Sequence, residues 1–382
     1  MSAVIDPLAE AKALRPLVEA EADATDAGLT LSQPLVEAFA KSKLFHLMVP
    51  EAFGGLEADS DTLLDVFEEL SHQDGSVGWT QMANASATSY VAFLDPGLGK
   101  AMLADQPESV FAGQFAPRGE VKRESGGYRV SGDFGFGSGS AHASYLGGAG
   151  MLFNDDGSPE ILESGMPGYL CFFVPQGQVE FKGGWDVMGL RGTGSFDYRV
   201  LEQHVDVEAG FFLFESTVRT GGALYGLGAT ALAGLGHAGW GLGVAQRALD
   251  EIAAVAAGGR VRMGAAALVD QQVFQRDFGE HSLALRAVRL LVHDVYGRAL
   301  ERLRAGDPLD KSWNDEVMAT VAYLTQIAEA ATLFAYRAAG SQGLRNPSCV
   351  QRCFRDMFTG GLHVYVDRRS YEELARGRLA GN

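Results

Sequence analysis

The stretch that decides the fold is Gly184-Trp185-Asp186-Val187-Met188-Gly189-Leu190-Arg191-Gly192-Thr193-Gly194-Ser195. Glycine lets backbone amides approach a ligand closely, and the interleaved Arg, Thr and Ser side chains can donate hydrogen bonds to it. A second loop of this kind, Phe134–Ser140, precedes it and is followed by His142. From residue chemistry alone, the two loops fit a ligand site and two turns of a β-barrel equally well.

The sequence around these loops has the pattern of β-strands. The runs Tyr128–Val130, Leu170–Val174 and Phe196–Val200 are rich in β-branched and aromatic residues and are bounded by Gly, Pro, Asn and Asp. We therefore predict a compact β domain, a barrel or sandwich, over residues 109–208.

Helical periodicity dominates the chain before the strands. One predicted helix face is formed by apolar residues at helical spacing, namely Leu63, Leu64, Val66, Phe67 and Leu70. Pro34 shortly after Ser32 predicts another helix start. The runs Phe53–Gly55 and Asp74–Gly78 are predicted to interrupt the helices. Residues 1–108 are predicted to form an N-terminal helical domain.

Helical periodicity returns after the strands. The predicted faces are Leu283, Leu285, Val288, Leu291 and Val292, and then Val317, Val321, Leu324 and Ile327. Residues 209–382 are predicted to form a C-terminal helical bundle. The succession of helices, strands and helices predicts an α+β protein, because a doubly wound sheet would need the two to alternate.

Composition narrows the classes of function. The chain has 382 residues, 47% of them hydrophobic and 21% charged, and a net charge of −17 without a basic block. Nucleic acid is therefore not an expected partner. No leader segment is readable at the start, so we expect a cytoplasmic protein. The three cysteines are too few for a disulfide framework, and no ligand set for a metal site accompanies them.

One segment has to be considered as a membrane span, because no charged residue occurs between Arg219 and Arg247. Its many glycines and few long aliphatic side chains favour a closely packed helix over a membrane span. The run Gly234–Gly239 has the spacing of a dinucleotide-binding motif but no preceding strand, which favours helix packing here too. We predict that the helix from Gly221 to Ala245 is buried between subunits of a homotetramer.

The quoted loop resembles the β-domain signature of the acyl-CoA dehydrogenase superfamily. Two further segments resemble that superfamily, Val49–Gly55 near the start and Gly340–Pro347 followed by Gln351–Asp356 near the end. The resemblance covers nearly the whole chain in the correct order. It implies an acyl-CoA dehydrogenase-like fold with an N-terminal helical domain, a central β domain and a C-terminal helical bundle.

Two chemistries compete within that superfamily, dehydrogenation of an acyl-CoA by FAD and oxygenation by reduced flavin and dioxygen. Dehydrogenation requires a positioned carboxylate base. The dehydrogenases usually carry this Glu after Arg-Asp, but here Arg355-Asp356 is followed by Met357–Tyr365 without a Glu. Some relatives place it on an earlier helix, where this chain has Ala229. The missing base favours oxygenation.

The loop with Ser138 resembles the Phe-Ser-Ser-Gly loop of the monooxygenase branch, whose second Ser lies against flavin N5. The resemblance implies that Ser138 and His363 are catalytic, with the imidazole as the acid–base group. It implies the following flavin-binding residues: Phe136, Ser138, Gly139, Trp185, Arg191, Thr193, Arg260, Gly340 and Gly343. Phenol hydroxylases of the branch often have a pocket Ser and His where this chain has Gly113 and Ala87.

The leading hypothesis is a two-component flavin monooxygenase that acts on a small or polycyclic organic substrate. The flavin is FAD or FMN, because Arg260–Gly264 only partly resembles the FAD-binding motif of the dehydrogenases. A separate flavin reductase is implied, since no nicotinamide site is visible. Two alternatives stay open: an acyl-CoA dehydrogenase with a divergent base, and a non-catalytic partner subunit of the same fold.

Overall fold

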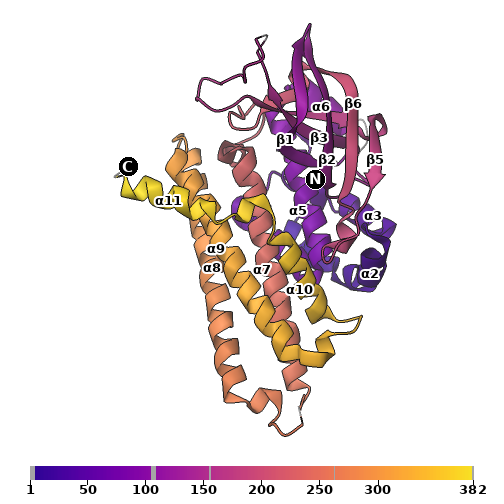
Figure 1. Ribbon diagram of the computed structural model, residues 1–382, viewed down its shortest axis with the longest axis vertical. Helices are drawn as coiled ribbons and strands as arrows, with labels where there is room; N and C mark the ends of the chain where they lie inside the picture. The colour runs from indigo at the N-terminus through magenta and orange to yellow at the C-terminus, as the bar shows by residue number, and fades with distance from the viewer. Residues whose placement is uncertain (1–4, 105–108, 155, 262, 381–382) are drawn as a thin grey trace.

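The computed structural model describes residues 5–104, 109–154, 156–261 and 263–380. Over these residues the chain forms helices, then one sheet, then a second set of helices. In Figure 1 the sheet lies above the long C-terminal helices, and the N-terminal helices lie beside both. The predicted α+β order is confirmed.

Within residues 5–104, six α-helices precede the sheet: α1 (Pro7–Ala13), α2 (Arg15–Gly28), α3 (Gln33–Lys41), α4 (Ser60–Gln73), α5 (Gly75–Ser89) and α6 (Pro96–Ala104). Short 3-10 turns join them, η1 (Leu44–His46), η2 (Glu51–Phe53) and η3 (Tyr90–Phe93). The predicted apolar face of α4 is buried throughout. The helix α3 begins directly after Ser32, as predicted, with Pro34 in its first turn.

The predicted break at Asp74–Gly78 is wrong beyond its first residue. Only Asp74 is extended, and Gly75 already begins α5. The Asp74 carboxylate accepts the N–H groups of Ser76 and Val77, at 2.9 and 3.1 Å, so it caps the helix despite the glycines. Gly78 is needed for packing, since a Cβ there would lie 2.1 Å from Ser71 Oγ on α4.

The central domain is a seven-stranded mixed sheet in the order β5-β6-β2-β1-β3-β4-β7. Its strands are β1 (Phe111–Glu124), β2 (Gly127–Gly137), β3 (Tyr145–Leu152), β4 (Tyr169–Pro175), β5 (Val179–Gly183), β6 (Phe196–Asp206) and β7 (Gly210–Phe212). β1 and β3 are parallel and the other pairs are antiparallel. The two glycine-rich loops follow β2 and β5, at the side of the sheet that meets α5.

In the described residues after the sheet there are five α-helices: α7 (Gly228–Ala257), α8 (Gln272–Arg304), α9 (Lys311–Ala339), α10 (Cys349–Gly360) and α11 (Arg369–Leu379). The predicted inner face of α8 is only partly right. Leu285, Val288 and Val292 are buried, but Leu283 and Leu291 are exposed. At the edge of the same face, Arg289 forms ion pairs with Asp65 and Glu68 of α4.

The helix α7 lies at the centre of the molecule and is buried by its own chain. It packs against α4, α5, α9 and α10. Its glycines allow this approach, since a Cβ on Gly239 would lie 2.6 Å from Phe67 and one on Gly243 would lie 2.2 Å from Glu68 O. The packing interpretation of the glycine motif is confirmed. The argument that α7 needs other subunits to bury it is wrong.

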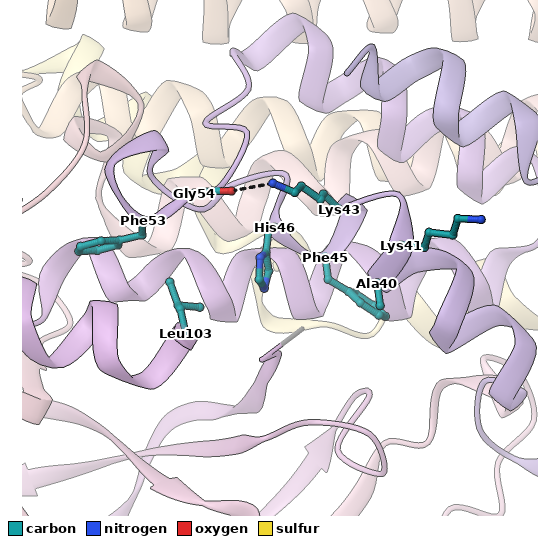
Figure 2. A pocket seen from close by; sticks show the side chains of 8 residues that line it. All are labelled: Ala40, Lys41, Lys43, Phe45, His46, Phe53, Gly54 and Leu103. Atoms are coloured by element: carbon teal, nitrogen blue, oxygen red, sulfur yellow. Dashed lines mark hydrogen bonds between the residues drawn. The ribbon is translucent and has the colours of Figure 1, made fainter. Parts of the chain in front are cut away.

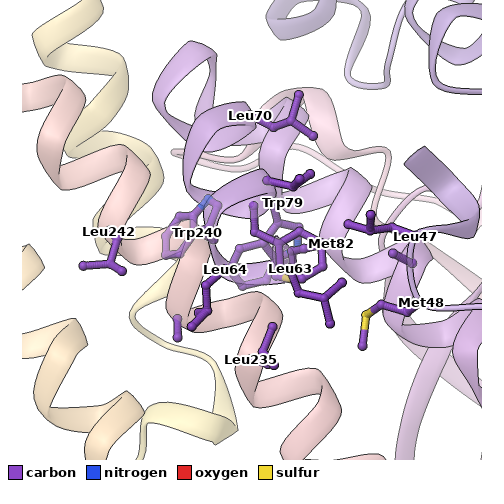
Figure 3. Packing of buried hydrophobic residues seen from close by; sticks show 14 of the residues in the cluster. Leu47, Met48, Leu63, Leu64, Leu70, Trp79, Met82, Leu235, Trp240 and Leu242 are labelled. Carbon is purple, nitrogen blue, oxygen red and sulfur yellow. The ribbon is translucent and has the colours of Figure 1, made fainter. Parts of the chain in front are cut away.

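The core around α7 joins the N-terminal and C-terminal helices. Figure 3 shows Leu63 and Leu64 of α4, Met82 of α5 and Leu235 and Trp240 of α7 packed against one another. Among the described residues, one helical stretch, Lys311–Gly343, is long and apolar enough to cross a membrane, but 56% of its most apolar window is buried within the protein. Such burial is typical of a core helix.

Candidate functional site

The two glycine-rich loops are tied to each other by hydrogen bonds. Gly139 N–H donates to Thr193 O at 2.8 Å, and Ser140 Oγ donates to Gly194 O at 3.1 Å. Gly139 has φ of +72°, and a Cβ there would lie 2.2 Å from Asn84 Oδ1, so only glycine fits. The two loops therefore lie against each other in the folded protein.

A row of hydroxyl groups connects the loops to α5. Trp79 Nε1 of α5 lies 3.0 Å from Ser138 Oγ, which lies 2.8 Å from Ser195 Oγ. Ser195 Oγ lies 2.6 Å from Thr193 Oγ1, which donates to Leu190 O at 2.8 Å. Ser138 retains 9% of its surface, whereas Ser195 and Thr193 are buried more deeply. Ser138 therefore lies at the outer end of a buried polar row.

The backbone of the Ser138 loop is held by a second residue of α5. Asn84 Nδ2 donates to Ser138 O at 3.3 Å and to Phe111 O at 3.0 Å. His142 Nε2 lies 3.0 Å from Asn84 Oδ1, which can only accept, so the ring carries its hydrogen on Nε2. Burial lowers the pKa of His142 to about 4, so the ring is neutral near pH 7. His142 therefore orients Asn84 and stabilises the loop.

His363 lies beside Trp79 at the start of η10 (Val364–Val366). Its ring centroid is 5.8 Å from that of Trp79, 5.5 Å from that of His237 and 4.9 Å from that of Tyr365. The turn before it is tightly packed, since a Cβ on Gly360 would lie 2.2 Å from the Trp240 ring. The structure thus brings His363 and Ser138 to the same tryptophan, from opposite domains.

The protonation state of His363 differs from the sequence expectation of a group that titrates near neutral pH. Burial lowers its pKa to about 4, so the imidazole is neutral at pH 7. The N–H of Tyr365 donates to Nδ1 at 3.3 Å, which leaves the ring hydrogen on Nε2. His363 consequently offers an N–H donor at Nε2 in place of an imidazolium.

His237 of α7 is a site residue that the sequence analysis missed. It is 1% exposed, and neither of its ring nitrogens has a hydrogen-bond partner among the residues that the structure describes. Burial and the neighbouring His363 hold its pKa well below the ordinary value, so it is neutral. A buried polar atom without a partner is costly and usually marks a ligand or water contact. The only signal in the sequence was a histidine within an uncharged, small-residue helix.

The remaining residues of the quoted loop hold its shape. Trp185 Nε1 donates to Leu190 O at 3.0 Å, and the Trp185 ring contacts Phe136, which is 62% exposed and has φ of +60°. Arg191 donates to Val187 O at 3.1 Å and lies 3.6 Å from Asp26. Trp185 and Phe136 therefore lie at the site, whereas Arg191 turns toward α2.

A buried ion network fixes the loop to α10. Asp356 Oδ1 accepts Leu190 N–H at 2.6 Å, while Asp356 Oδ2 has no hydrogen-bond partner within the described part of the chain. Burial, and then the neighbouring Asp74, raise the pKa of Asp356 to about 7. Arg352 donates to Asp74 at 3.2 Å and also to Asp23. The Arg-Asp motif thus holds the loop and does not reach His363 directly.

Arg260, Gly340 and Gly343 form a separate group. Arg260 Nη1 donates to Ala338 O, and η9 (Gly340–Gly343) follows directly. α7 rises about 1.5 Å per residue, so its end at Ala257 lies about 30 Å from His237. The three residues are therefore not brought to Ser138 within one chain. Arg262, part of the same motif, lies outside the described residues.

Two cavities lie away from these residues. One of about 300 Å³ lies near η1 and η2, and Lys41, Lys43 and His46 are among the side chains around it (Figure 2). Another of about 230 Å³ lies between α2 and α10, beside Arg352 and Arg355. Neither cavity contains Ser138 or His363, so neither is the predicted flavin site.

The residues around Trp79 fit a flavin. Ser138 and His363 present polar groups, and His237 has two nitrogens without a partner among the described residues. The side chains packed against Trp79 are otherwise aromatic. A planar ring system with a polar edge needs this combination of stacking surfaces and few placed hydrogen bonds. Phe136 and Trp185 would flank such a ring on the side of the sheet.

Comparison with known proteins identifies the family. Residues 9–94 match the acyl-CoA dehydrogenase N-terminal domain, and residues 235–368 match the acyl-CoA dehydrogenase C-terminal domain. An indole-3-acetate monooxygenase of Pseudomonas putida is 28% identical over 90% of this chain and 85% of its own. The oxygenase subunit HsaA of a flavin-dependent monooxygenase of Mycobacterium tuberculosis is 30% identical over 48% of this chain and 44% of its own.

The solved structures agree on the fold. XiaF from Streptomyces sp., in complex with FADH2 and glycerol, superposes with a TM-score of 0.88 over 98% of this chain and 95% of its own, at 20% identity. The predicted resemblance and the predicted flavin dependence are confirmed. The chain belongs to the acyl-CoA dehydrogenase superfamily and, within it, to the branch of flavin-dependent monooxygenases.

Proposed function

We propose that the protein is the oxygenase component of a two-component monooxygenase, which receives reduced flavin from a separate reductase and inserts oxygen into a small or polycyclic organic substrate. The observation that carries the proposal is the set of groups around Trp79. This set contains neutral imidazoles and hydroxyls, and the positions where dehydrogenases carry their base hold Ala229 and the Glu-free run Met357–Tyr365. When bound, reduced flavin would supply the electrons that activate dioxygen.

Residues of this chain would bind and orient the reactants. Ser138 and Asn84 hold the loop against which the flavin edge would lie. His363 would donate its Nε2–H to an oxygen atom of a reactant, and Trp79 and Trp240 would exclude water around it. No proton need be exchanged with His363 at neutral pH for this role.

Aromatic rings favour an apolar, flat substrate. Tyr90, Phe115 and Phe173 form a continuous cluster with ring centroids 5.0 and 5.5 Å apart. The serine of phenol hydroxylases cannot occur at Gly113, because a Cβ there would lie 2.5 Å from Gly147 O. A substrate anchored by a phenol group at that position is therefore disfavoured, as the sequence suggested.

One carboxylate supports the dehydrogenase alternative. Glu329 of α9 lies under the turn before His363, where a Cβ on Gly361 would be 2.2 Å from its Oε1. Burial raises its pKa, as a general base would require. It is the residue to test if the oxygenase proposal fails.

The test uses the purified chain with FAD and FMN. We expect tight binding of reduced flavin, oxygen-dependent product from aromatic substrates, and dependence on an added flavin reductase. Anaerobic flavin reduction by an acyl-CoA, abolished in Glu329→Gln, would establish the dehydrogenase instead. Absence of flavin binding in both redox states would indicate a non-catalytic partner subunit.

We also propose a homo-oligomer, with a tetramer as the expected state. Leu283 and Leu290 of α8 lie two turns apart, 67% and 61% exposed. In addition, Arg260, Gly340 and Gly343 would reach a flavin at Ser138 only from another copy of the chain. Light scattering tests this, and a monodisperse monomer would contradict it.

A further inference from the structure

The hydroxyl row at Ser138 has two ends whose hydrogen-bonding roles are fixed by chemistry. Trp79 Nε1–H can only donate, so Ser138 Oγ accepts from it at 3.0 Å. Leu190 O can only accept, so the single hydrogen of Thr193 Oγ1 is used in the 2.8 Å contact with Leu190 O. The direction of the row can therefore be derived from its ends.

The two middle contacts then allow one arrangement. Thr193 has no second hydrogen, so the 2.6 Å contact between Ser195 Oγ and Thr193 Oγ1 requires Ser195 to donate. Two hydroxyl oxygens that close without a hydrogen between them would repel. With the hydrogen of Ser195 used, Ser138 must donate in the 2.8 Å contact with Ser195. The row runs from Trp79 through Ser138, Ser195 and Thr193 to Leu190 O.

Burial makes this direction persistent. Thr193 is 0% and Ser195 is 2% exposed, so water cannot supply alternative partners. Reversing the row would leave Thr193 Oγ1 and Leu190 O 2.8 Å apart with no hydrogen between them, and two oxygen atoms at that distance would repel. Ser138 consequently has no hydrogen to offer outside the row, and what it presents to a ligand is a lone pair.

We infer that this directed row makes the site selective for reduced flavin, with Thr193 and Ser195 as positioning residues that act through Ser138. The inference rests on the proposed function and on the resemblance to the monooxygenase branch, which implies that Ser138 lies against flavin N5. Reduced flavin carries a hydrogen on N5 and can donate to the Ser138 lone pair. Oxidised flavin has a lone pair on N5, which faces a second acceptor and is repelled.

The test measures the ratio of the Kd of oxidised flavin to the Kd of reduced flavin, with FAD and FMN as probes under anaerobic conditions. In the parent protein we expect this ratio to be well above one. Thr193→Val keeps the side-chain shape and removes the hydroxyl, and Leu190 O keeps its bond from Trp185 Nε1. Ser195 can then donate to Ser138, which frees the Ser138 hydrogen for N5.

We expect the ratio to fall about tenfold in Thr193→Val, which corresponds to a midpoint potential of the bound flavin that is about 30 mV more negative. Ser195→Ala should lower the ratio of the two Kd values in the same way. It replaces Thr193→Val in the test if that variant folds poorly. The matched control is Ser140→Ala, in the loop of Ser138 and as fully buried as Thr193, whose hydroxyl donates to Gly194 O outside the row. Its ratio should equal that of the parent.

The outcomes separate this inference from the proposed function. A parent protein that binds neither redox form refutes flavin use itself. A parent that binds both forms equally, or an unchanged ratio in both Thr193→Val and Ser195→Ala, overturns the directed row while flavin binding stands. An equal fall in Ser140→Ala would attribute the effect to loop loosening and would also overturn it.

Discussion

The polar atoms on one side of Trp79 have hydrogen-bond partners, and those of His237 on the other side have none among the described residues. On the side of the sheet, Ser138, Ser195 and Thr193 form a complete row in which every hydroxyl hydrogen is used. On the helical side, His237 is fully buried and both of its nitrogens are unpaired. A satisfied polar group stabilises the shape of a site, whereas an unsatisfied one has binding capacity that only a ligand or water can use.

The largest effect is expected at His363. His363→Asn removes the Nε2–H donor beside Trp79, so product formation should fall by about 10²-fold or more, the usual size of a lost hydrogen-bond donor to a reacting oxygen. The measurement is product formed per reduced flavin at saturating substrate. Flavin affinity and melting temperature should stay near those of the parent. A variant that keeps most of its activity would remove His363 from the mechanism.

Replacing His237 should raise the stability of the protein and lower its affinity for the ligand. His237→Phe removes two buried, unpaired nitrogens, so the free energy of unfolding should rise by about 1–3 kcal/mol. Ligand affinity should weaken about tenfold, which corresponds to about 1.4 kcal/mol. Urea unfolding and a binding titration measure the two quantities. Lower stability of the variant would mean that the imidazole already has partners in the folded protein.

Substitutions of Asp356 test whether α10 stabilises the loop Gly184–Ser195. Asp356→Ala leaves Leu190 N–H without an acceptor and should lower the free energy of unfolding by about 1–3 kcal/mol. Asp356→Asn retains an acceptor oxygen and removes the repulsion with Asp74, so at pH 8 it should be at least as stable as the parent. Equal losses in both variants would show that the charge itself is needed.

A further prediction concerns the pH dependence of stability. Burial lowers the pKa of His142 and His363 to about 4, and that of His237 is also lowered. Between pH 6.5 and 4 the unfolded chain therefore binds more protons, and the free energy of unfolding should fall as the pH falls through this window.

The contribution of Asp356 to the pH dependence of the free energy of unfolding has the opposite sign. Its raised pKa, about 7, means that the folded protein binds more protons as the pH falls below 7, which offsets part of that loss. Asp356→Asn should accordingly show a steeper fall of the free energy of unfolding with decreasing pH than the parent. A flat profile in this variant would contradict the neutral, buried state of the histidines.

Several local predictions from the sequence were right because local chemistry decides them. The apolar spacing of α4, the start of α3 at Ser32 and the strand run Leu170–Val174 all depend on residues close in the chain. The errors arose where a tertiary contact outweighed a local preference. Gly75 and Gly78 are helical because Asp74 caps them and α4 lies against them, and Leu283 faces outward although it fits the period.

By itself, the sequence determined the order of the elements, the superfamily and the absence of the usual carboxylate base, since each of these can be read from spacing and residue type. Only the tertiary structure decided which residues share the site. Ser138, His237 and His363 come from the sheet, α7 and the turn after α10, and they meet at Trp79 of α5. The same packing separates Arg260 from them, because a straight helix keeps its two ends apart.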